Sequence, residues 1–394
     1  MNRWQEACPT FHDLVEPCAQ LPSDSRQKNE RKVWVRAGLG MNAIRQDSKP
    51  THTPPHTMRA VVLRQPGGTE NLVLSTLPLP QAPAGWVRIA VRAFGLNRSE
   101  LHTRLGLSQG VTFPRVLGIE AVGVIDELGA DDRKGGLERG QQVATVLGGM
   151  GRIFDGGYAE YVVVPRRQVI AFSSTLPWAV LGAVPETLQT AHGSLNIGLD
   201  LQPGQTLLIR GGTSALGLAA ATLAKDRGAT VLATTRQPAR AEALRAHGAD
   251  HVIVDDGQIA MAVRAIVPAG VDAALELVGT PTLPDTLRAT RVHGTVCFTG
   301  MLSNRWTVDE FYPIDYIPRG VRLTAYAGGA DDLPAPVLQA YLDRLAAGSL
   351  SIGPLQTYTL DDMPRAHADL EHNRVFGKLV GVIDPIDAAA ATPR

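Results

Sequence analysis

Cysteine is scarce in this sequence, and neither sign of charge is in excess. The three cysteines, Cys8, Cys18 and Cys297, have neither metal-ligand spacing nor the pattern of a disulfide framework. Lys and Arg together number 38, as do Asp and Glu, and no basic block is interleaved with aromatic residues. This balance argues against nucleic acid as a main partner.

Long hydrophobic runs are also missing. The longest fall well short of a membrane-spanning helix, and the N-terminus lacks the apolar core of a signal peptide and the acid-free, Arg-rich character of a transit peptide. We therefore expect no membrane partner and a reducing, cytoplasmic location.

The 394 residues, 44% of them apolar, are enough for a large core and two domains. Residues 1–57 have scattered charges, no sustained periodicity and a loop-like end, K-P-T-H-T-P-P-H-T. We predict that they form a disordered N-terminal extension, that a compact domain begins at Met58, and that residues 385–394 are a tail.

A glycine-rich turn marks the centre of the chain. The segment 205–228 reads Q-T-L-L-I-R-G-G-T-S-A-L-G-L-A-A-A-T-L-A-K-D-R-G, an apolar strand that breaks into a turn and opens an Ala-rich helix. Gly212 lets the backbone pass close to a phosphate, Gly217 allows close packing of helix and strand, and the helix N-terminus offers free N–H groups. Ser214 stands where a strict G-x-G-x-x-G has its second glycine, so the pattern alone also fits an ordinary strand-to-helix crossover.

Further short apolar runs follow at the spacing of alternating strands and helices. We predict strands at Thr230–Thr235, His251–Val254, Val271–Val278 and Gly294–Thr299, and a helix at Ala239–His247. This repetition is typical of a doubly wound parallel sheet, the Rossmann arrangement, which binds its ligand at the carboxyl ends of the strands. The sequence therefore predicts a dinucleotide site at the glycine-rich turn.

The end of the second strand indicates which dinucleotide binds. NAD enzymes usually have an acidic residue there, but this chain reads A-T-T-R-Q-P-A-R, with Arg236 and Arg240 close by. Guanidinium groups match the oxygens and charge of a 2′-phosphate, so NADPH is favoured. Arg240 also fits a solvated helix position.

The region from Met58 to about Val184 is mainly β, with short strands such as Trp86–Ala93 and Tyr161–Val164 between Gly and Pro. The closing run F-G-K-L-V-G-V-I-D reads as a strand that returns to this region. We predict a β-rich domain of residues 58–184 and 323–384, interrupted by a nucleotide-binding domain of residues 185–322.

Four further motifs lie along the chain, separated from one another in the sequence. They are G-L-N-R-S-E-L-H-T-R-L-G at 95–106, F-P-R-V-L-G-I-E-A-V-G-V-I at 113–125, D-G-G-Y-A-E-Y at 155–161 and P-E-T-L-Q-T-A at 185–191. With the glycine-rich turn and the closing G-K-L-V, they resemble the medium-chain dehydrogenase/reductase superfamily from Met58 to Asp384. The resemblance implies a GroES-like catalytic domain, a Rossmann domain, a cleft between them, and a homodimer or homotetramer.

Within that superfamily the chain resembles the zinc-free quinone oxidoreductase branch, which includes zeta-crystallin. Zinc alcohol dehydrogenases have a Cys where this chain has Asn97 and a His where it has Ile119. An isoleucine cannot bind a metal and an amide oxygen is a poor substitute for a thiolate, so no metal is expected. Without a Lewis acid, reduction by NADPH of a quinone or an α,β-unsaturated carbonyl is favoured over alcohol oxidation.

On the substrate side, Asn97 is the leading candidate, because its amide could donate to the acceptor oxygen. Ser99, His102 and Tyr158 are weaker candidates. Each also has a structural interpretation, as a turn or helix cap for Asn97 and Ser99 and as packed groups for the other two. Leu107 and its neighbours replace the tyrosine that many quinone oxidoreductases carry there, so solvent is a possible proton donor.

On the cofactor side, the turn and the family's nicotinamide-facing positions supply the candidates. They are Gly212, Thr213, Ser214, Ala215, Leu216 and Gly217 for the pyrophosphate, Arg236 and Arg240 for the 2′-phosphate, and Thr190, Gly300 and Met301 near the nicotinamide.

Two other functions remain open. One is an enoyl reductase that acts on thioester-linked or carrier-bound substrates and shares every cofactor residue. The other is an NADPH-binding protein without catalysis, crystallin-like or RNA-associated, which the neutral charge disfavours.

Overall fold

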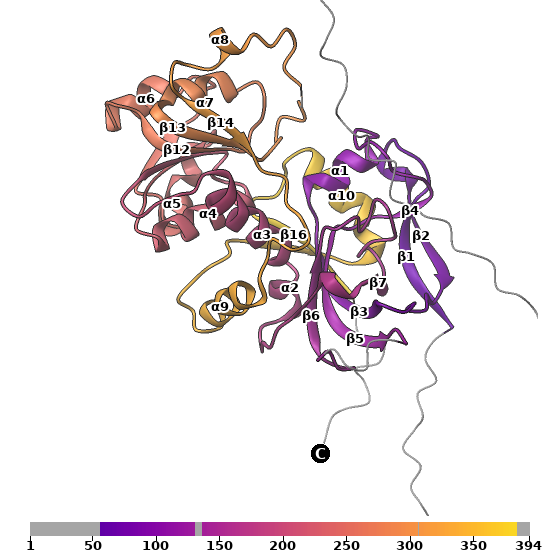
Figure 1. Cartoon of the computed structure of the whole chain (residues 1–394). Helices are drawn as coiled ribbons and strands as arrows, with labels where there is room; N and C mark the ends of the chain where they lie inside the picture. The colour runs from indigo at the N-terminus through magenta and orange to yellow at the C-terminus, as the bar shows by residue number, and fades with distance from the viewer. Residues whose placement is uncertain (1–55, 131–135, 306, 384–394) are drawn as a thin grey trace, which may run out of the picture. The chain divides into compact units, whose positions relative to one another are not determined.

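The fold is taken from a computed structural model that describes residues 56–130, 136–305 and 307–383 (Figure 1). The predicted extension, apart from residues 56 and 57, and the predicted tail at 385–394 lie outside the described residues. In the described part, no helix is both long enough and apolar enough to cross a membrane.

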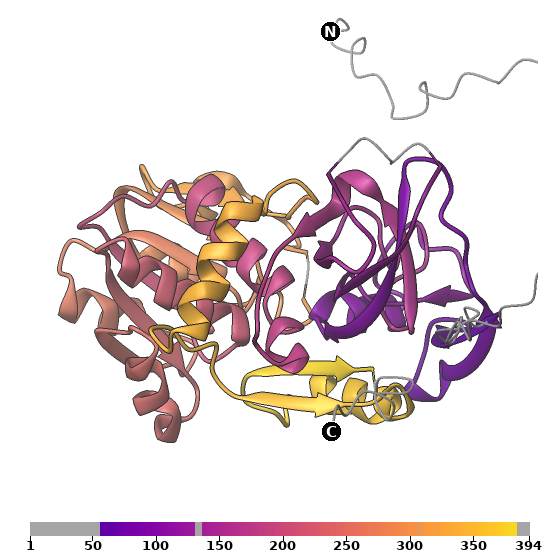
Figure 2. The same cartoon turned by 90° about the horizontal axis from the view of Figure 1, so that it is seen from below.

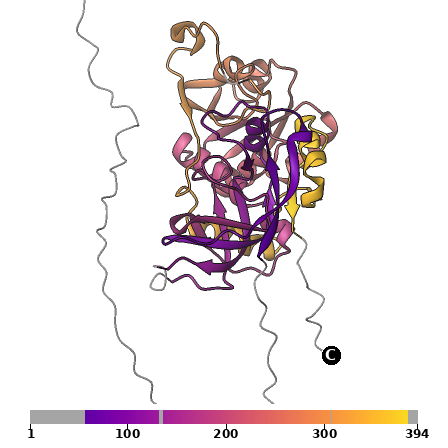
Figure 3. The same ribbon diagram turned by 90° about the vertical axis from the view of Figure 1, so that its right-hand side faces the viewer.

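Two sheets form the β-rich part, and their strand pairs are antiparallel except that β15 is parallel to β16. The first is a three-stranded sheet in the order β2-β1-β4, and the second has the order β15-β16-β3-β5-β6-β8 with β7 also paired to β3. The strands are β1 (Thr57–Leu63), β2 (Leu72–Pro78), β3 (Trp86–Gly95), β4 (Arg115–Val116), β5 (Glu120–Leu128), β6 (Gln142–Val146), β7 (Tyr161–Pro165), β8 (Val169–Ala171), β15 (Leu355–Tyr358) and β16 (Lys378–Val382). The indigo and violet N-terminal strands gather in one part of the structure (Figure 3).

Alternating side chains of these strands build a shared core. Val87, Ile89 and Val91 of β3 point to one side of the sheet and are almost fully buried. Their neighbours come from β1 and from helix α10 (Met363–Glu371), which contributes Met363. The β-rich prediction for this region is therefore met by two sheets of mainly antiparallel strands that share one core.

A third sheet has six strands and is parallel throughout. Its order is β11-β10-β9-β12-β13-β14. The strands are β9 (Thr206–Arg210), β10 (Thr230–Thr235), β11 (His251–Val254), β12 (Val271–Glu276), β13 (Thr290–Phe298) and β14 (Arg322–Ala325). The chain is thus an α/β protein with a GroES-like part and a Rossmann-like parallel sheet, as the sequence predicts.

Helices cover both faces of this sheet, because alternate strand residues are apolar on both sides. Leu207 and Ile209 of β9 pack in the same core as α4, whereas Leu208 packs with α6 and α7. Figure 1 shows α4 and α5 on one side of the sheet and α6 and α7 on the other. The helices are α3 (Pro185–Gly193), α4 (Ala215–Asp226), α5 (Ala241–Ala246), α6 (Ala260–Ile266) and α7 (Leu283–Ala289).

The remaining helical elements are short, except α9. They are α1 (Arg98–Arg104), α2 (Trp178–Leu181), α8 (Pro313–Tyr316), α9 (Ala335–Ala346) and the single turns η1 (Thr69–Asn71), η3 (Arg166–Gln168), η4 (Ser194–Gly198), η5 (Pro238–Arg240) and η6 (Leu360–Asp362).

After β14 the chain returns to the β-rich part and adds two strands to its seven-stranded sheet. The predicted closing strand corresponds to β16, which pairs antiparallel with β3 and parallel with β15. Figure 2 shows these C-terminal strands as yellow arrows beside a helix of the same colour. Since β14 belongs to the parallel sheet, the domain boundary predicted between residues 322 and 323 falls inside this strand, and the sheet extends to Ala325.

Candidate functional site

The glycine-rich turn joins β9 to α4 in a tight junction. Ser214 caps the helix: its Oγ accepts a hydrogen bond from the N–H of Gly217 at 3.0 Å and donates to the carbonyl of Gly211 at 2.9 Å. A Cβ on Gly217 would lie 2.6 Å from the carbonyl oxygen of Gly212, so helix and strand touch only because this residue has no side chain. Ser214 therefore has a structural use at the place where a strict motif has glycine.

This junction provides the chemistry that a pyrophosphate needs. The first N–H groups of a helix have no partner within the helix, and Ser214 satisfies only that of Gly217. The others point out of the helix end, where its dipole is positive. All six residues predicted for the pyrophosphate lie here, namely Gly212, Thr213, Ser214, Ala215, Leu216 and Gly217.

A buried arginine ties together the strand ends beneath the turn. Arg210, fully buried at the end of β9, forms a two-pronged ion pair with Asp255 after β11, with both distances 2.9 Å, and a second ion pair with Asp285 of α7 at 2.9 Å. Burial acts to raise the pKa of Asp255, but Arg210 outweighs it and the pKa is lowered. The network fixes the carboxyl edge of the sheet, where a nucleotide would bind.

The end of β10 carries arginines and no carboxylate. Thr234 accepts a hydrogen bond from the N–H of Gly211 at 3.1 Å, which places the strand end beside the turn. Arg236 follows the strand and is exposed, and the Arg240 guanidinium lies 4.9 Å from the ring centre of Phe376. Both predicted 2′-phosphate residues are thus on the same rim as the turn.

The residues predicted near the nicotinamide lie at two neighbouring places. Thr190 of α3 donates a hydrogen bond to Glu186 at 3.0 Å. Gly300 follows β13, and a Cβ there would come within 2.6 Å of the Leu277 backbone, so this position requires glycine. A contact of 3.0 Å between the hydroxyls of Ser194 and Thr299 connects the end of α3 with the segment that contains Gly300 and Met301.

Asn97 lies in a buried polar cluster. Its Nδ2 donates to Glu120 at 2.9 Å, and its Oδ1 accepts from the Lys378 ammonium at 2.5 Å. Lys378 also bonds Glu120 at 3.0 Å. Both ends of the Asn97 amide are therefore engaged within the protein, and this geometry does not present the amide to an acceptor.

Ser99 and His102 lie on successive turns of α1 and face other parts of the chain. The Ser99 hydroxyl accepts a hydrogen bond from Arg152 at 2.5 Å. The His102 Nε2 lies 3.1 Å from Oδ1 of Asn304, which also accepts from Arg98 at 3.4 Å. Burial, the first cause, and the charges of Arg98 and Arg152 lower the pKa of His102, although the bond to Asn304 opposes this.

These contacts bring the two groups of candidates together. Asn304 comes three residues after Met301, so α1 with Ser99 and His102 meets the loop of the predicted nicotinamide residues. Ser214 also forms a β-bridge with Gly377, directly before Lys378, which joins the glycine-rich turn to the C-terminal strand.

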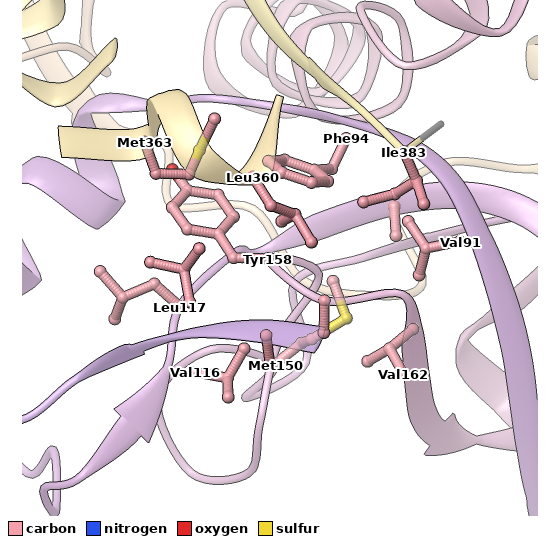
Figure 4. Close-up of a cluster of buried hydrophobic side chains, with 14 of the residues drawn as sticks. Val91, Phe94, Val116, Leu117, Met150, Tyr158, Val162, Leu360, Met363 and Ile383 are labelled. Carbon is pink, nitrogen blue, oxygen red and sulfur yellow. The ribbon is translucent and has the colours of Figure 1, made fainter. Parts of the chain in front are cut away.

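Tyr158 lies apart from this group. Its ring is fully buried among Phe94, Leu117, Leu360 and Met363, as Figure 4 shows. Its hydroxyl lies 3.2 Å from Nε2 of His367, and burial raises the pKa of Tyr158 well above the usual value. The packed-group interpretation describes this environment.

Several residues of the site have no strong local signal in the sequence. Lys378 stands in the closing G-K-L-V and could have been found as a lone cation in an apolar strand. Arg210, the lone cation in the apolar strand before the glycine-rich turn, could have been found in the same way. The contact of Arg152 with Ser99 joins residues 53 positions apart, which no local pattern reveals.

The donor set does not fit zinc. Ile119 is apolar and buried, and the Asn97 amide is already bonded at both ends. Among the residues that the structure describes, no group of three or more His, Cys, Asp or Glu side chains is placed to hold a metal ion.

Comparison with known proteins identifies the families that two parts of the chain match. Residues 83–174 match the family described as alcohol dehydrogenase GroES-like domain, and residues 215–343 match the family described as zinc-binding dehydrogenase. The spectinabilin polyketide synthase system protein NorB of Streptomyces orinoci is 31% identical over 344 residues, which are 84% of this chain and 15% of NorB. The chain thus spans a small part of that relative's length.

Solved structures share the fold over most of the chain. AibC has a TM-score of 0.75 at 28% identity, covering 86% of this chain and 99% of AibC. The mycobacterial Rv1454c complexed with NADPH has a TM-score of 0.73 at 25% identity, covering 82% and 99%. For the quinone oxidoreductase from Coxiella burnetii the TM-score is 0.73 at 24% identity, covering 83% and 100%. The chain belongs to the medium-chain dehydrogenase/reductase superfamily of oxidoreductases.

Proposed function

We propose that this oxidoreductase uses NADPH to reduce a quinone or an α,β-unsaturated carbonyl without a metal ion. One observation carries the proposal. The start of α4 at Ser214–Gly217, which would hold the cofactor phosphates, is joined by the Ser214–Gly377 bridge to the segment of Lys378, which bonds Asn97, and neither Asn97 nor Ile119 can serve as a zinc ligand. Bound NADPH would supply a hydride to the electrophilic carbon of the acceptor.

The choice of NADPH over NADH rests on the rim at the end of β10. An acidic side chain there would repel a 2′-phosphate, whereas exposed Arg236 and half-buried Arg240 would attract it. The relative Rv1454c, complexed with NADPH, has the same fold.

The protein's own groups would position the reactants and stabilise the product anion. The N–H groups at the start of α4 hold the pyrophosphate, while Ser99 and His102 are hydrogen-bonding groups on the substrate side. Because burial lowers the pKa of His102, its imidazole is neutral near pH 7, and the proton that completes the reduction comes from solvent. Asn97 would fix α1 against Glu120 rather than touch the acceptor.

A thioester-linked enoyl substrate is the second candidate. The similarity to a segment of the polyketide synthase protein NorB favours it, since polyketide chains are carried as thioesters. The homodimer or homotetramer implied by the family resemblance, and the cytoplasmic location, stay predictions.

The test follows NADPH absorbance with chelator-treated protein and an ortho-quinone, a small enone or a crotonyl thioester, with NADH in parallel. We expect NADPH loss that survives chelation and exceeds the NADH rate. Replacing both Arg236 and Arg240 by Gln should raise the KM for NADPH about tenfold or more and leave that for NADH nearly unchanged, because charged hydrogen bonds to the 2′-phosphate are lost.

Binding of NADPH without turnover would contradict the proposal. If NADPH raises the melting temperature but no acceptor consumes it, the protein binds the cofactor without turnover, and the non-catalytic alternative replaces this proposal.

A further inference from the structure

The loop that follows β6 presents an arginine to the substrate-side residues. It reads L-G-G-M-G-R-I-F from Leu147 to Phe154, and Arg152 is exposed while Met150 is buried. Ile153, next to Arg152, is 77% exposed. The loop therefore has a buried anchor and an exposed tip that combines a cation with an apolar side chain.

The loop is held firmly in place. The N–H of Leu147 donates to the carbonyl of Ile119 at 2.7 Å, and Gln168 donates to the carbonyl of Gly148 at 2.9 Å. A Cβ on Gly151 would lie 2.8 Å from the carbonyl oxygen of Gly118, so the loop packs closely against the turn before β5. Arg152 is thus projected from a fixed base rather than from a free segment.

Arg152 has a neutral partner. Its Nη2 donates to the Ser99 hydroxyl at 2.5 Å, and it forms no ion pair with any described carboxylate. The acidic residue of its own loop region, Asp155, is already paired with Arg115 at 2.9 Å and accepts from the N–H of Val116. The charge of Arg152 is therefore left uncompensated beside a substrate-side hydroxyl.

The neighbouring groups add positive charge. Arg98 on α1 bonds the amide oxygens of Asn304 and Asn373, again without a described ion pair. Glu371, the carboxylate that acts on Arg98 electrostatically, is itself bonded to Arg104 at 2.5 Å. The surroundings of Ser99 and His102 thus carry an excess of cationic side chains, in a protein whose overall charge is zero.

We propose that Arg152 binds an anionic oxygen group, a carboxylate or a phosphate, of the acceptor that this enzyme reduces. The inference rests on the proposed reductase function and narrows its substrate class to acceptors that carry such a group. The planar guanidinium of Arg152 fits two oxygens of either anion, and the uncompensated charge makes the exchange of Ser99 for an anion favourable. Neither a simple quinone nor a neutral enone would use this arginine.

The test compares matched acceptors that differ in the anionic group. Crotonyl 4′-phosphopantetheine and crotonyl pantetheine differ in one phosphate, and 4-oxo-2-pentenoate and its methyl ester differ in the carboxylate. Binding of each to the complex of the protein with NADP⁺ is measured by calorimetry, and reduction by NADPH is measured separately. The variants are Arg152→Gln, Arg152→Lys and, as a matched exposed arginine elsewhere, Arg319→Gln.

We expect wild type to bind at least one anionic acceptor about tenfold more tightly than its neutral partner. The neutral acceptor lacks one charge-assisted hydrogen bond to Arg152, which is enough for a difference of this size. Arg152→Gln should abolish this preference and leave the neutral acceptors unchanged, Arg152→Lys should restore part of it, and Arg319→Gln should have no effect. The pair that shows the preference identifies phosphate or carboxylate as the group.

Failure of the two proposals can be told apart. Equal binding of anionic and neutral acceptors in wild type, or an equal effect of Arg152→Gln on both, overturns the anion site even if all are reduced. A charge preference that depends on Arg152, with no reduction of any acceptor, keeps the anion site and overturns the reductase function.

Discussion

Lys378 is 5% exposed and lies between two carboxylates, with its Nζ 3.0 Å from Glu120 and 3.6 Å from Glu186. Burial acts to lower its pKa, but Glu120 and Glu186 outweigh burial and the pKa is raised. A charged ammonium therefore persists inside the protein. Its hydrogen bonds join β16 to β5 and to Asn97 before α1, so one side chain ties two strands to the helix that carries Ser99 and His102.

Removal of this ammonium should destabilise the protein strongly. We expect Lys378→Met to lower the free energy of unfolding by about 3–5 kcal/mol, because Glu120 stays buried without its partner. Lys225→Met, which breaks the exposed pair of Lys225 with Asp250, should cost less than about 1 kcal/mol. Urea unfolding followed by circular dichroism measures both, and equal losses in the two variants would contradict the prediction.

The same cluster shows how far local sequence reaches at the scale of the residue. The motif G-L-N singled out Asn97, and the closing G-K-L-V was recognised as a strand. That these two residues bond each other, 281 positions apart, follows from the pairing of β16 with β3 and not from either motif. The motif around Asn97 therefore could not predict that both ends of its amide are hydrogen-bonded within the protein.

At the scale of the element, the junction of β9 and α4 depends on backbone contact. A Cβ on Gly217 would lie 2.6 Å and 2.7 Å from the carbonyl oxygens of Gly212 and Gly211. These are backbone atoms of the turn itself, which cannot rotate away, so a side chain at position 217 must displace the helix from the turn.

Gly217→Ala should therefore weaken both folding and cofactor binding. We expect a loss of about 1–3 kcal/mol in the free energy of unfolding from overpacking, and about tenfold weaker NADPH binding as the N–H groups move. Gly329→Ala is the control, since the nearest atom to its Cβ would be 3.7 Å away. Fluorescence titration with NADPH and thermal unfolding test this, and unchanged NADPH affinity in Gly217→Ala would refute the role of close packing.

The parallel sheet was the most predictable group of elements. The predicted strands Thr230–Thr235 and His251–Val254 are found at those bounds, because each is a short apolar run with Gly or polar residues at its ends. β14, by contrast, has only four residues with the pattern R-L-T-A, of which two are exposed. Its place in the sheet comes from pairing with β13, and the sequence alone put the domain boundary inside it.

At the scale of the whole molecule, two buried titratable groups act in opposite directions on stability. Burial, with the charge of Arg104 as a smaller cause, lowers the pKa of His367 to about 3. Burial raises the pKa of Glu100 to about 7, although hydrogen bonds from backbone N–H groups oppose this. Neither group touches the proposed cofactor cradle, so their effects concern folding.

The directions follow from which state binds the proton. Below about pH 6.5 the unfolded chain protonates its histidine while folded His367 stays neutral, so His367 makes the protein less stable as pH falls toward about 3. Between about pH 4.5 and 7, folded Glu100 keeps a proton that the unfolded chain loses, so Glu100 makes the protein less stable as pH rises. Between about pH 4.5 and 6.5 the two groups change the free energy of unfolding in opposite directions with pH, and these two pH dependences cancel.

Replacing His367 should reveal the contribution of Glu100 to the pH dependence of the free energy of unfolding. We expect the free energy of unfolding of His367→Gln, relative to wild type, to rise by about 1.4 kcal/mol for each pH unit from 6.5 down to 4.5. His372→Gln, which removes an exposed imidazole at the end of the same helix, is the matched control and should show a difference that changes little with pH. Urea unfolding at pH 6.5, 5.5 and 4.5 measures this, and a pH-independent difference for His367→Gln would mean that folded His367 accepts a proton as readily as the unfolded chain does.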